Sequence, residues 1–259
     1  KLGAVVTGLA PASLLSTYAA ERRPVAQQLI DFDKEWSSLM ARKPEEISDP
    51  EDLATYYLAT AEFPSGFMTQ YEPGASVVAD AAHQERATGF PIGKRIKSAP
   101  VTRAADGNVV HLGHHAKADG RWRIYAFADA DGTALADFAG WLADAPDSPI
   151  VRQTPAGADI DAVFDPKVIY PGGYDEIDVT RVPASFRPRT GPLHLTDWEK
   201  VFAAAPNRWN ATDIHAERGI SRDGAVVVVR PDQYVAGVFP LDGVDGVQEL
   251  AVFFDAWLL

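Results

Sequence analysis

The sequence contains no cysteine and no long apolar segment. Without cysteine the chain cannot form a disulfide, a thiolate metal site or a dithiol redox centre, which is typical of a cytoplasmic protein. Its longest apolar runs, such as residues 225–229 and 250–254, are far shorter than the roughly 20 residues that span a bilayer. Basic residues are also few: 24 Lys and Arg stand against 36 Asp and Glu, a net charge of -12. We therefore expect neither nucleic acid nor a membrane as a partner.

Several motifs that would define an enzyme are also absent from the sequence. It has no Gly-x-Gly-x-x-Gly turn for a dinucleotide, no Gly-x-x-x-x-Gly-Lys-Ser/Thr loop for nucleotide phosphates and no Gly-x-Ser-x-Gly nucleophile elbow. What is present is the composition of a globular protein, with 46% hydrophobic and 10% aromatic residues. The 259 residues are enough for one large or two ordinary domains. We expect a folded chain without a catalytic centre of its own.

The N-terminal part of the sequence has a helical pattern. Apolar residues recur at three- and four-residue steps through residues 13–42, which predicts one long amphipathic helix. Ser13 is the predicted N-cap, and Pro24 predicts a kink or break, because proline has no amide proton to donate. The charged segment 43–49 is interpreted as a linker.

A second helix is predicted directly after this linker. Ser48 or Asp49 would cap it, Pro50 suits its first turn, and the helix should end before Pro64. The following stretch up to residue 91 is irregular and rich in proline and glycine. We place the main domain boundary there, which gives domains 1–88 and 89–259.

Beyond the boundary the pattern changes to strands and short helices. The predicted strands are a half-buried one at 121–128, two short ones at 160–164 and 168–170, and a hairpin of 220–229 with 234–239. The predicted helices are one with Leu135, Phe138, Ala139 and Leu142 facing inward, a short one at 198–204 capped by Thr196 or Asp197, and a final one at 247–259. This order predicts an α/β fold with a central mixed sheet in a thioredoxin-like layer arrangement. Without cysteine, such a domain cannot exchange disulfides.

Three histidines, His111, His114 and His115, lie close together in the sequence. With Asp106 or Asp119 they would supply the ligand types that a transition metal prefers. In an extended segment, however, His114 and His115 point to opposite faces, and no glutamate lies at a matching helical spacing. We interpret them as surface or interface histidines, and a histidine metalloprotein is the alternative.

Two turns carry further candidate polar groups. Asp129 and Asp131 follow a strand and precede a helix, where two acids could act as acid and base if burial raised one pKa. We interpret them as a turn and a helix cap. Arg230 begins the turn Arg230-Pro231-Asp232 and could bind a carboxylate or phosphate. We interpret it as a brace of that turn. No catalytic, cofactor-binding or metal-ligating residue is assigned to the chain.

Several stretches of the sequence are long enough to compare with known families. They are GLAPASLLSTYAAERRPVAQQLIDFD (Gly8–Asp33), GKRIKSAPVTRAADGNVVHLG (Gly93–Gly113), ADGRWRIYAFAD (Ala118–Asp129), RGISRDGAVVVVRPDQYVAGVFPL (Arg218–Leu241) and LAVFFDAWL (Leu250–Leu258). The first resembles the helix that follows the flavin-binding segment in the phenol hydroxylase family of FAD-dependent aromatic monooxygenases. The others resemble the opening and the end of that family's C-terminal domain.

This resemblance implies an enzyme that uses FAD, NADPH and oxygen to hydroxylate a phenol, a small-molecule substrate. It also implies that residues 1–88 are a helical remnant of the flavin and substrate domain, and that residues 89–259 are a thioredoxin-like domain that forms a homodimer. The family's flavin motifs would precede Lys1. We therefore expect no FAD on this chain alone, a missing N-terminal FAD domain as its partner, and no activity without it.

Two alternative interpretations concern the N-terminal residues and whether the chain functions without a flavin domain. Lys1 with the apolar residues after it could be the end of a secretory signal in an acidic secreted domain, but we interpret Lys1 as a position within a longer polypeptide. The chain could also be a stand-alone binding or dimerisation module without catalysis. In that case Leu14, Val25 and Trp36 should pack inside the chain. If they evolved to pack on a flavin domain, an apolar stripe should be exposed.

Overall fold

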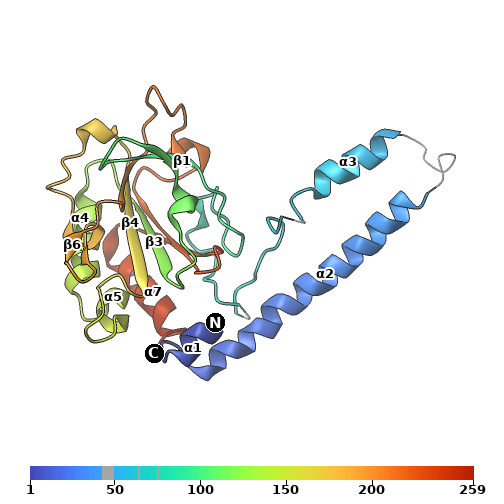
Figure 1. The fold of residues 1–259 in the computed structure, drawn as a ribbon, viewed down its shortest axis with the longest axis horizontal. Helices are drawn as coiled ribbons and strands as arrows, with labels where there is room; N and C mark the ends of the chain where they lie inside the picture. The colour runs from blue at the N-terminus through green and yellow to red at the C-terminus, as the bar shows by residue number, and fades with distance from the viewer. Residues whose placement is uncertain (43–49, 64, 75) are drawn as a thin grey trace.

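A computed structural model describes residues 1–42, 50–63, 65–74 and 76–259. The chain forms two parts, a body built on a seven-stranded sheet and an arm that projects from it (Figure 1). The arm is defined here as the described residues between 16 and 63, and the body as the remaining described residues. Both termini lie at the base of the arm, where the amide of Leu259 donates to the carbonyl of Leu9 at 3.1 Å. No helix among the described residues has the length and apolarity needed to cross a membrane.

The sheet of the body is mixed. In spatial order its strands are β2 (Val109–His111), β1 (Pro100–Arg103), β7 (Val201–Ala203), β4 (Phe164–Tyr170), β3 (Trp122–Phe127), β8 (Ala225–Val229) and β9 (Val235–Pro240). β3, β4 and β7 run parallel to one another, and the remaining pairs are antiparallel. A separate two-stranded sheet joins β5 (Arg189–Thr190) and β6 (Leu195–Thr196). The predicted α/β fold with a central mixed sheet is confirmed.

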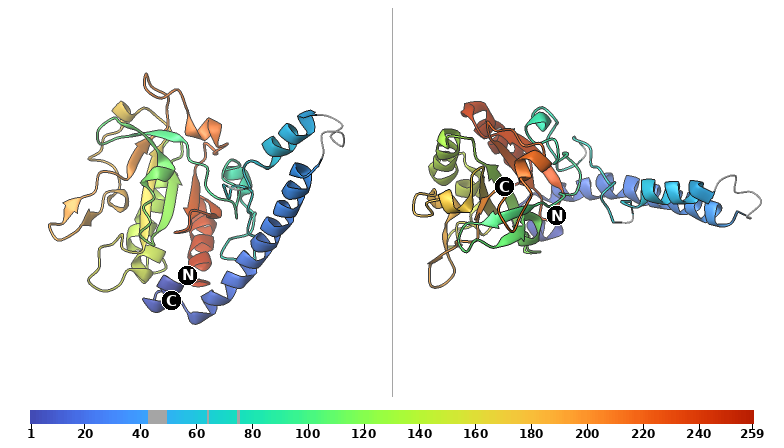
Figure 2. Two further views of the ribbon diagram at one scale, coloured as in Figure 1. Left: turned by 45° about the vertical axis from the view of Figure 1, so that its right-hand side comes forward. Right: turned by 90° about the horizontal axis from the view of Figure 1, so that it is seen from above.

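The helices lie on both sides of this sheet and in the arm. The α-helices are α1 (Leu2–Val6), α2 (Ser16–Met40), α3 (Pro50–Thr60), α4 (Thr133–Asp144), α5 (Pro149–Gln153), α6 (Ile214–Glu217) and α7 (Gly243–Asp255). The 3-10 helices are η1 (Ala12–Leu15), η3 (Gln84–Arg86), η4 (Leu112–His115), η5 (Tyr174–Glu176) and η6 (Ala184–Phe186). α2 and α3 form the arm, which extends well beyond the body in every view (Figure 2).

The centre of the body has the predicted thioredoxin-like order. A crossover containing α4 joins the parallel strands β3 and β4, as a right-handed sheet twist favours, and the hairpin β8–β9 leads into α7. Residues of α4 and α7, such as Phe138 and Phe254, pack on one face of the sheet. Segments preceding β1, with Tyr71 and Phe90, cover the other face together with Ile214 of α6. The sheet is therefore buried on both faces.

Burial on both faces corrects the prediction for β3. The alternating sequence predicted a half-buried strand, but all six residues of β3 are buried. Ile124 faces the layer of α4 and α7, whereas Tyr125 faces the opposite layer. Arg123 is buried because carboxylates surround its guanidinium. A polar residue in a strand therefore does not identify a solvent-facing side when a counter-charge is buried beside it.

Two further strands differ from prediction. The strand predicted at 160–164 is wrong except for its last residue, because residues 160–163 form a turn and Phe164 begins β4. The candidate 168–170 is the end of the same strand, which contains Pro166. The amide of Val168 donates to the carbonyl of Lys200, on the side of β4 that faces β7. The nitrogen of Pro166 faces the same side, but β7 begins only opposite Val168. The sheet therefore loses no hydrogen bond through the missing amide proton of Pro166. The helix predicted at 198–204 is wrong. Only Val201–Ala203 form a regular element, the strand β7, because pairing between β4 and β1 buries Val201 and Phe202 on opposite faces.

The long N-terminal helix also differs in detail. Ser13 does not cap it, because residues 12–15 form the 3-10 helix η1 and α2 starts at Ser16. Of the kink or break predicted at Pro24, the break is wrong, since α2 continues through that residue as one helix. The kink stays a prediction. Pro24 has no amide proton, so the helix lacks one backbone hydrogen bond at this position.

Of the remaining predictions, one concerns residues that the structure does not describe, and the others are confirmed. The linker 43–49, with the proposed caps Ser48 and Asp49, is outside the described residues, whereas α3 starts at Pro50 and ends before Pro64 as predicted. The hairpin is confirmed as β8 and β9, and the inward residues of α4 are the four predicted ones. The last helix is confirmed, but it starts and ends four residues earlier than predicted, at Gly243 and Asp255.

Candidate functional site

The three histidines do not form a metal site in the described part of the chain. His111 and His114 are exposed, with their ring centroids 5.1 Å apart. His115 turns inward against the ring of Phe202, and burial lowers its pKa. No group of three or more metal-ligating side chains exists among the described residues. The interpretation as surface histidines therefore fits His111 and His114, while His115 is a packing residue.

Asp129 and Asp131 lie in the turn between β3 and α4. Both oxygens of Asp129 accept hydrogen bonds from the start of α4, from the amides of Ala134 at 3.1 Å and Leu135 at 2.9 Å. Asp131 accepts from the amide of Thr133 at 2.9 Å, which lowers its pKa. The two acids thus satisfy free amides of the first turn, as in a helix cap. The predicted cap is confirmed, and the arrangement does not raise the pKa of Asp131 for acid catalysis.

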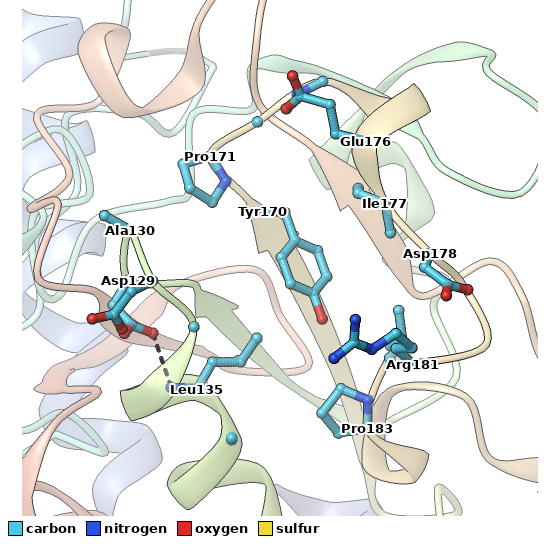
Figure 3. A pocket seen from close by; sticks show the side chains of 16 residues that line it. Asp129, Ala130, Leu135, Tyr170, Pro171, Glu176, Ile177, Asp178, Arg181 and Pro183 are labelled. Carbon is cyan, nitrogen blue, oxygen red and sulfur yellow. Dashed lines mark hydrogen bonds between the residues drawn. The ribbon is translucent and has the colours of Figure 1, made fainter.

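A cavity of about 590 Å³ opens beside this turn (Figure 3). It lies between the carboxyl ends of the parallel strands β3 and β4, the position where open α/β sheets bind ligands. Tyr170, at the end of β4, projects into it, and burial raises the pKa of its phenol to about 12. Residues from the β4–η5 loop and from the segment before η6, among them Arg181, close the opposite side. This volume suits a small ligand.

Arg230 joins the arm to the body. Its guanidinium donates to both oxygens of Glu21 on α2, at 2.8 and 2.9 Å, and to Asp232 within its own turn. Arg230 and Glu21 are each 4% exposed. Lys1 lies 2.7 Å from Glu21, and the amide of Val77 donates to Glu21 as well. The predicted brace of the turn is confirmed.

The same contacts show that this arginine does more than brace its turn. Although burial opposes ionisation, Glu21 and Asp232 raise the pKa of Arg230 above its ordinary value. Its guanidinium also lies over the rings of Tyr71 and Tyr234. Arg230 therefore fixes the base of the arm through a buried, paired charge.

A second group of buried charges lies at the amino ends of β3, β4 and β7. Asp165, 1% exposed, is surrounded by Arg123, Lys167 and Lys200. Burial opposes its ionisation, but Lys167 and Lys200 hold the pKa of Asp165 well below its usual range. Burial lowers the pKa of Lys167 to about 8. We interpret this cluster as structural, because its cations and carboxylates satisfy one another inside the sheet.

Sequence reasoning missed most of these groups. Glu21 and Arg230 are separated by 209 positions, and only the fold brings them together. Arg123 and Asp165 pair across β3 and β4. The sequence indicated a buried charge only at Arg123 and Lys167. Arg123 lies inside a predicted strand, and Lys167 directly precedes another. Tyr170 and Arg181 carried no signal, because neither belongs to a recognisable motif.

Comparison with known proteins identifies a family for most of the chain. Residues 69–259 match the family model described as phenol hydroxylase, C-terminal dimerisation domain. Over 252 residues the chain is 44% identical to 3-hydroxybenzoate 4-monooxygenase from Comamonas testosteroni, which covers 93% of this chain and 39% of that protein. It is 31% identical to the FAD-dependent monooxygenase terD from Aspergillus terreus, over 100% of this chain and 44% of that protein. The chain thus spans about two fifths of the length of these relatives.

A solved structure shows the same fold. The flavin-dependent monooxygenase PieE, in complex with FAD and substrate, superposes on 98% of this chain and 41% of its own length. The TM-score is 0.53 at 16% sequence identity. At this identity the similarity concerns the fold alone, and it extends over both the arm and the body.

Proposed function

Because the chain belongs to the phenol hydroxylase C-terminal dimerisation domain family, we propose that it is the structural, dimer-forming part of an FAD-dependent enzyme that hydroxylates phenolic rings. The observation that carries this proposal is the match of residues 69–259, which includes the whole sheet of the body. The names of the relatives support a hydroxybenzoate or another phenol as substrate. The partner of the body is a second copy of the same chain, and a cytoplasmic location remains a prediction.

The arm supports a second part of the proposal. Tyr18 near its base and Leu29 and Met40 further out are 62%, 55% and 57% exposed. A large exposed apolar stripe indicates an interaction surface. We propose that a flavin domain of the same polypeptide covers this stripe, so that residues 1–88 belong to the flavin and substrate domain and residues 89–259 to the dimerisation domain.

The described residues do not themselves fit FAD. The sequence lacks the glycine-rich turn whose amides receive a pyrophosphate. The cavity beside α4 is lined by the carboxylates of Asp129, Asp131, Glu176 and Asp178, with one arginine, Arg181. Four carboxylates around a single cation repel a pyrophosphate. FAD and NADPH would therefore be held by polypeptide outside these 259 residues, and this chain would contribute assembly and no catalytic step.

The experiment compares this chain with the complete gene product. The complete protein should show flavin absorption and should oxidise NADPH when 3-hydroxybenzoate or phenol is added, with formation of a dihydroxylated product. The 259-residue chain should be colourless and should sediment as a dimer. A complete product without bound flavin, or a 259-residue chain that remains monomeric at micromolar concentration, would contradict the proposal.

One observation favours the alternative of a stand-alone module. Leu14 is buried in the core of the body, and Val25 packs against its opposite layer. Trp36 packs only within the arm, against Tyr56 and Tyr57. The base of the arm is thus covered by this chain itself. A stable, monodisperse dimer of the 259-residue chain whose arm resists proteolysis would favour the module over the flavin-domain partner.

A further inference from the structure

The acidic residues around the cavity beside α4 already have hydrogen-bond donors. Asp129 and Asp131 accept from amides of α4, as described above. Glu176 accepts from the amide of Gly173 at 3.0 Å. Asp178 accepts from both the amide and the hydroxyl of Thr180, at 2.9 and 2.6 Å. Both oxygens of Asp129 and one oxygen each of Asp131, Glu176 and Asp178 accept these bonds, so the four carboxylates shape the local turns.

Two donors in the same cavity have no such partner. Within the described residues, neither the guanidinium of Arg181 nor the hydroxyl of Tyr170 makes a hydrogen bond or an ion pair. In Figure 3 the two groups point toward one another across the cavity, and the guanidinium of Arg181 turns away from Asp178. A phenol is protonated at neutral pH, and burial raises the pKa of Tyr170 further, to about 12, so its hydroxyl is a donor. The cavity thus offers two convergent donors and needs a ligand with acceptors.

The rest of the lining is apolar. Leu135, Ile177, Pro171 and Pro183 lie around the ring of Tyr170 (Figure 3), and Val182 also lines the cavity. A flat ring can stack on a phenol ring and on proline faces. A carboxylate matches the planar fork of a guanidinium, with which it makes two parallel hydrogen bonds.

We propose that this cavity binds a small aromatic monocarboxylate, whose carboxylate is held by Arg181 and Tyr170 and whose ring lies on the apolar lining. The four surrounding carboxylates restrict the ligand to a single negative charge, because a second anionic group would have no cation to pair with. The inference does not use the proposed hydroxylase activity. It assigns to the body a ligand site separate from any flavin domain.

Titration of the 259-residue chain with benzoate, followed by backbone amide NMR, tests the proposal. Saturable shifts should appear at Gly132, Gly172 and Gly173, which line the cavity. Arg181→Met should weaken binding at least about tenfold, since a hydrogen bond to a charged group is lost. Tyr170→Phe should weaken it by a smaller factor of about five. Arg181 is exposed, so its replacement should leave the fold intact.

The matched control is Arg208→Met, which removes another exposed arginine that lies over the ring of Trp209, outside the cavity. It should leave benzoate binding unchanged. Benzamide and phthalate should both bind more weakly than benzoate, the first for lack of charge and the second for its excess. The proposal is overturned if benzoate gives no saturable shifts at millimolar concentration, if Arg181→Met binds it equally well, or if benzylamine binds more tightly. None of these readouts depends on flavin or on dimer formation, so they are independent of the test of the proposed function.

Discussion

The body and the arm differ in what covers their apolar residues. In the body, both faces of β3 and β8 are buried under other parts of the same chain. In the arm, the apolar stripe of α2 is covered at its base by the body and further out only by α3. There Phe32 and Trp36 stack on Tyr56, while Leu29 remains 55% exposed.

The body buries its own apolar residues, whereas the outer arm does not. A helix in water obtains most of its stability from packing one apolar face, and its intrinsic propensity contributes little. The body has two filled layers and needs no further partner for its core. The outer arm buries only part of its stripe, which supports the proposal that another domain completes it.

The largest effect is expected from the buried charges of the body. Asp165→Asn would leave Arg123, Lys167 and Lys200 without their shared carboxylate, and the free energy of unfolding should fall by about 3–5 kcal/mol. Urea denaturation followed by tryptophan fluorescence measures this. Asp255→Asn is the control, because it breaks an exposed pair with Arg152 and should change the value by less than about 1 kcal/mol. Equal effects of the two variants would contradict a structural role for the cluster.

The next effect concerns the junction between the two parts. Arg230→Met should lower the free energy of unfolding by about 3 kcal/mol, because it removes the main partner of the buried Glu21. Lys1 would still pair with Glu21, which limits the loss. The amides of α2 near Glu21 should also exchange faster with solvent in this variant. The double variant Glu21→Met/Arg230→Met should be more stable than the sum of the two single effects predicts, and strict additivity would show that the pair is not coupled.

A pH effect is expected from His215 in α6. Its ring is buried, and Nδ1 lies 3.6 Å from a carboxylate oxygen of Asp213. Burial nevertheless lowers the pKa of His215 to about 4, with a further contribution from Arg222. In the unfolded chain the ring binds a proton below about pH 6.5. The unfolded state therefore binds more protons between pH 6.5 and 4, so the free energy of unfolding should decrease across that window as the pH falls, by about 2–3 kcal/mol. His215→Phe, which keeps the contact with Phe127, should lose this part of the pH dependence.

The fold of the body was largely predictable from sequence, and the reasons are local. The stripe Leu135, Phe138, Ala139 and Leu142 has helical spacing, and it gave α4 with the correct inward face. The hairpin β8–β9 follows from two apolar runs around a turn, in which Gln233 adopts a positive φ of 70°. Strand β7 was mistaken for a helix, because a three-residue strand carries no periodicity and depends on pairing with β4 and β1.

The candidate sites were less predictable, because they depend on contacts distant in sequence. Arg230 could be read as a turn brace, since Asp232 is two residues away, but its partner Glu21 lies on another element. Likewise, Tyr170 and Arg181 come from the end of a strand and from an irregular segment. No spacing rule connects such residues before the fold is known, whereas the cap formed by Asp129 is a local signal and was found.

The smallest effect should come from the outer arm, and it gives the sharpest contrast with its base. Leu29→Gln should change the free energy of unfolding by less than about 0.5 kcal/mol, because the side chain is mainly exposed. The same substitution at Leu14, which is 7% exposed in the body core, should cost about 3 kcal/mol. Urea denaturation at low protein concentration measures both. If Leu29→Gln proved as costly as Leu14→Gln, the outer stripe would already be covered within the 259-residue chain or its dimer, and a flavin domain would not be needed to complete the arm.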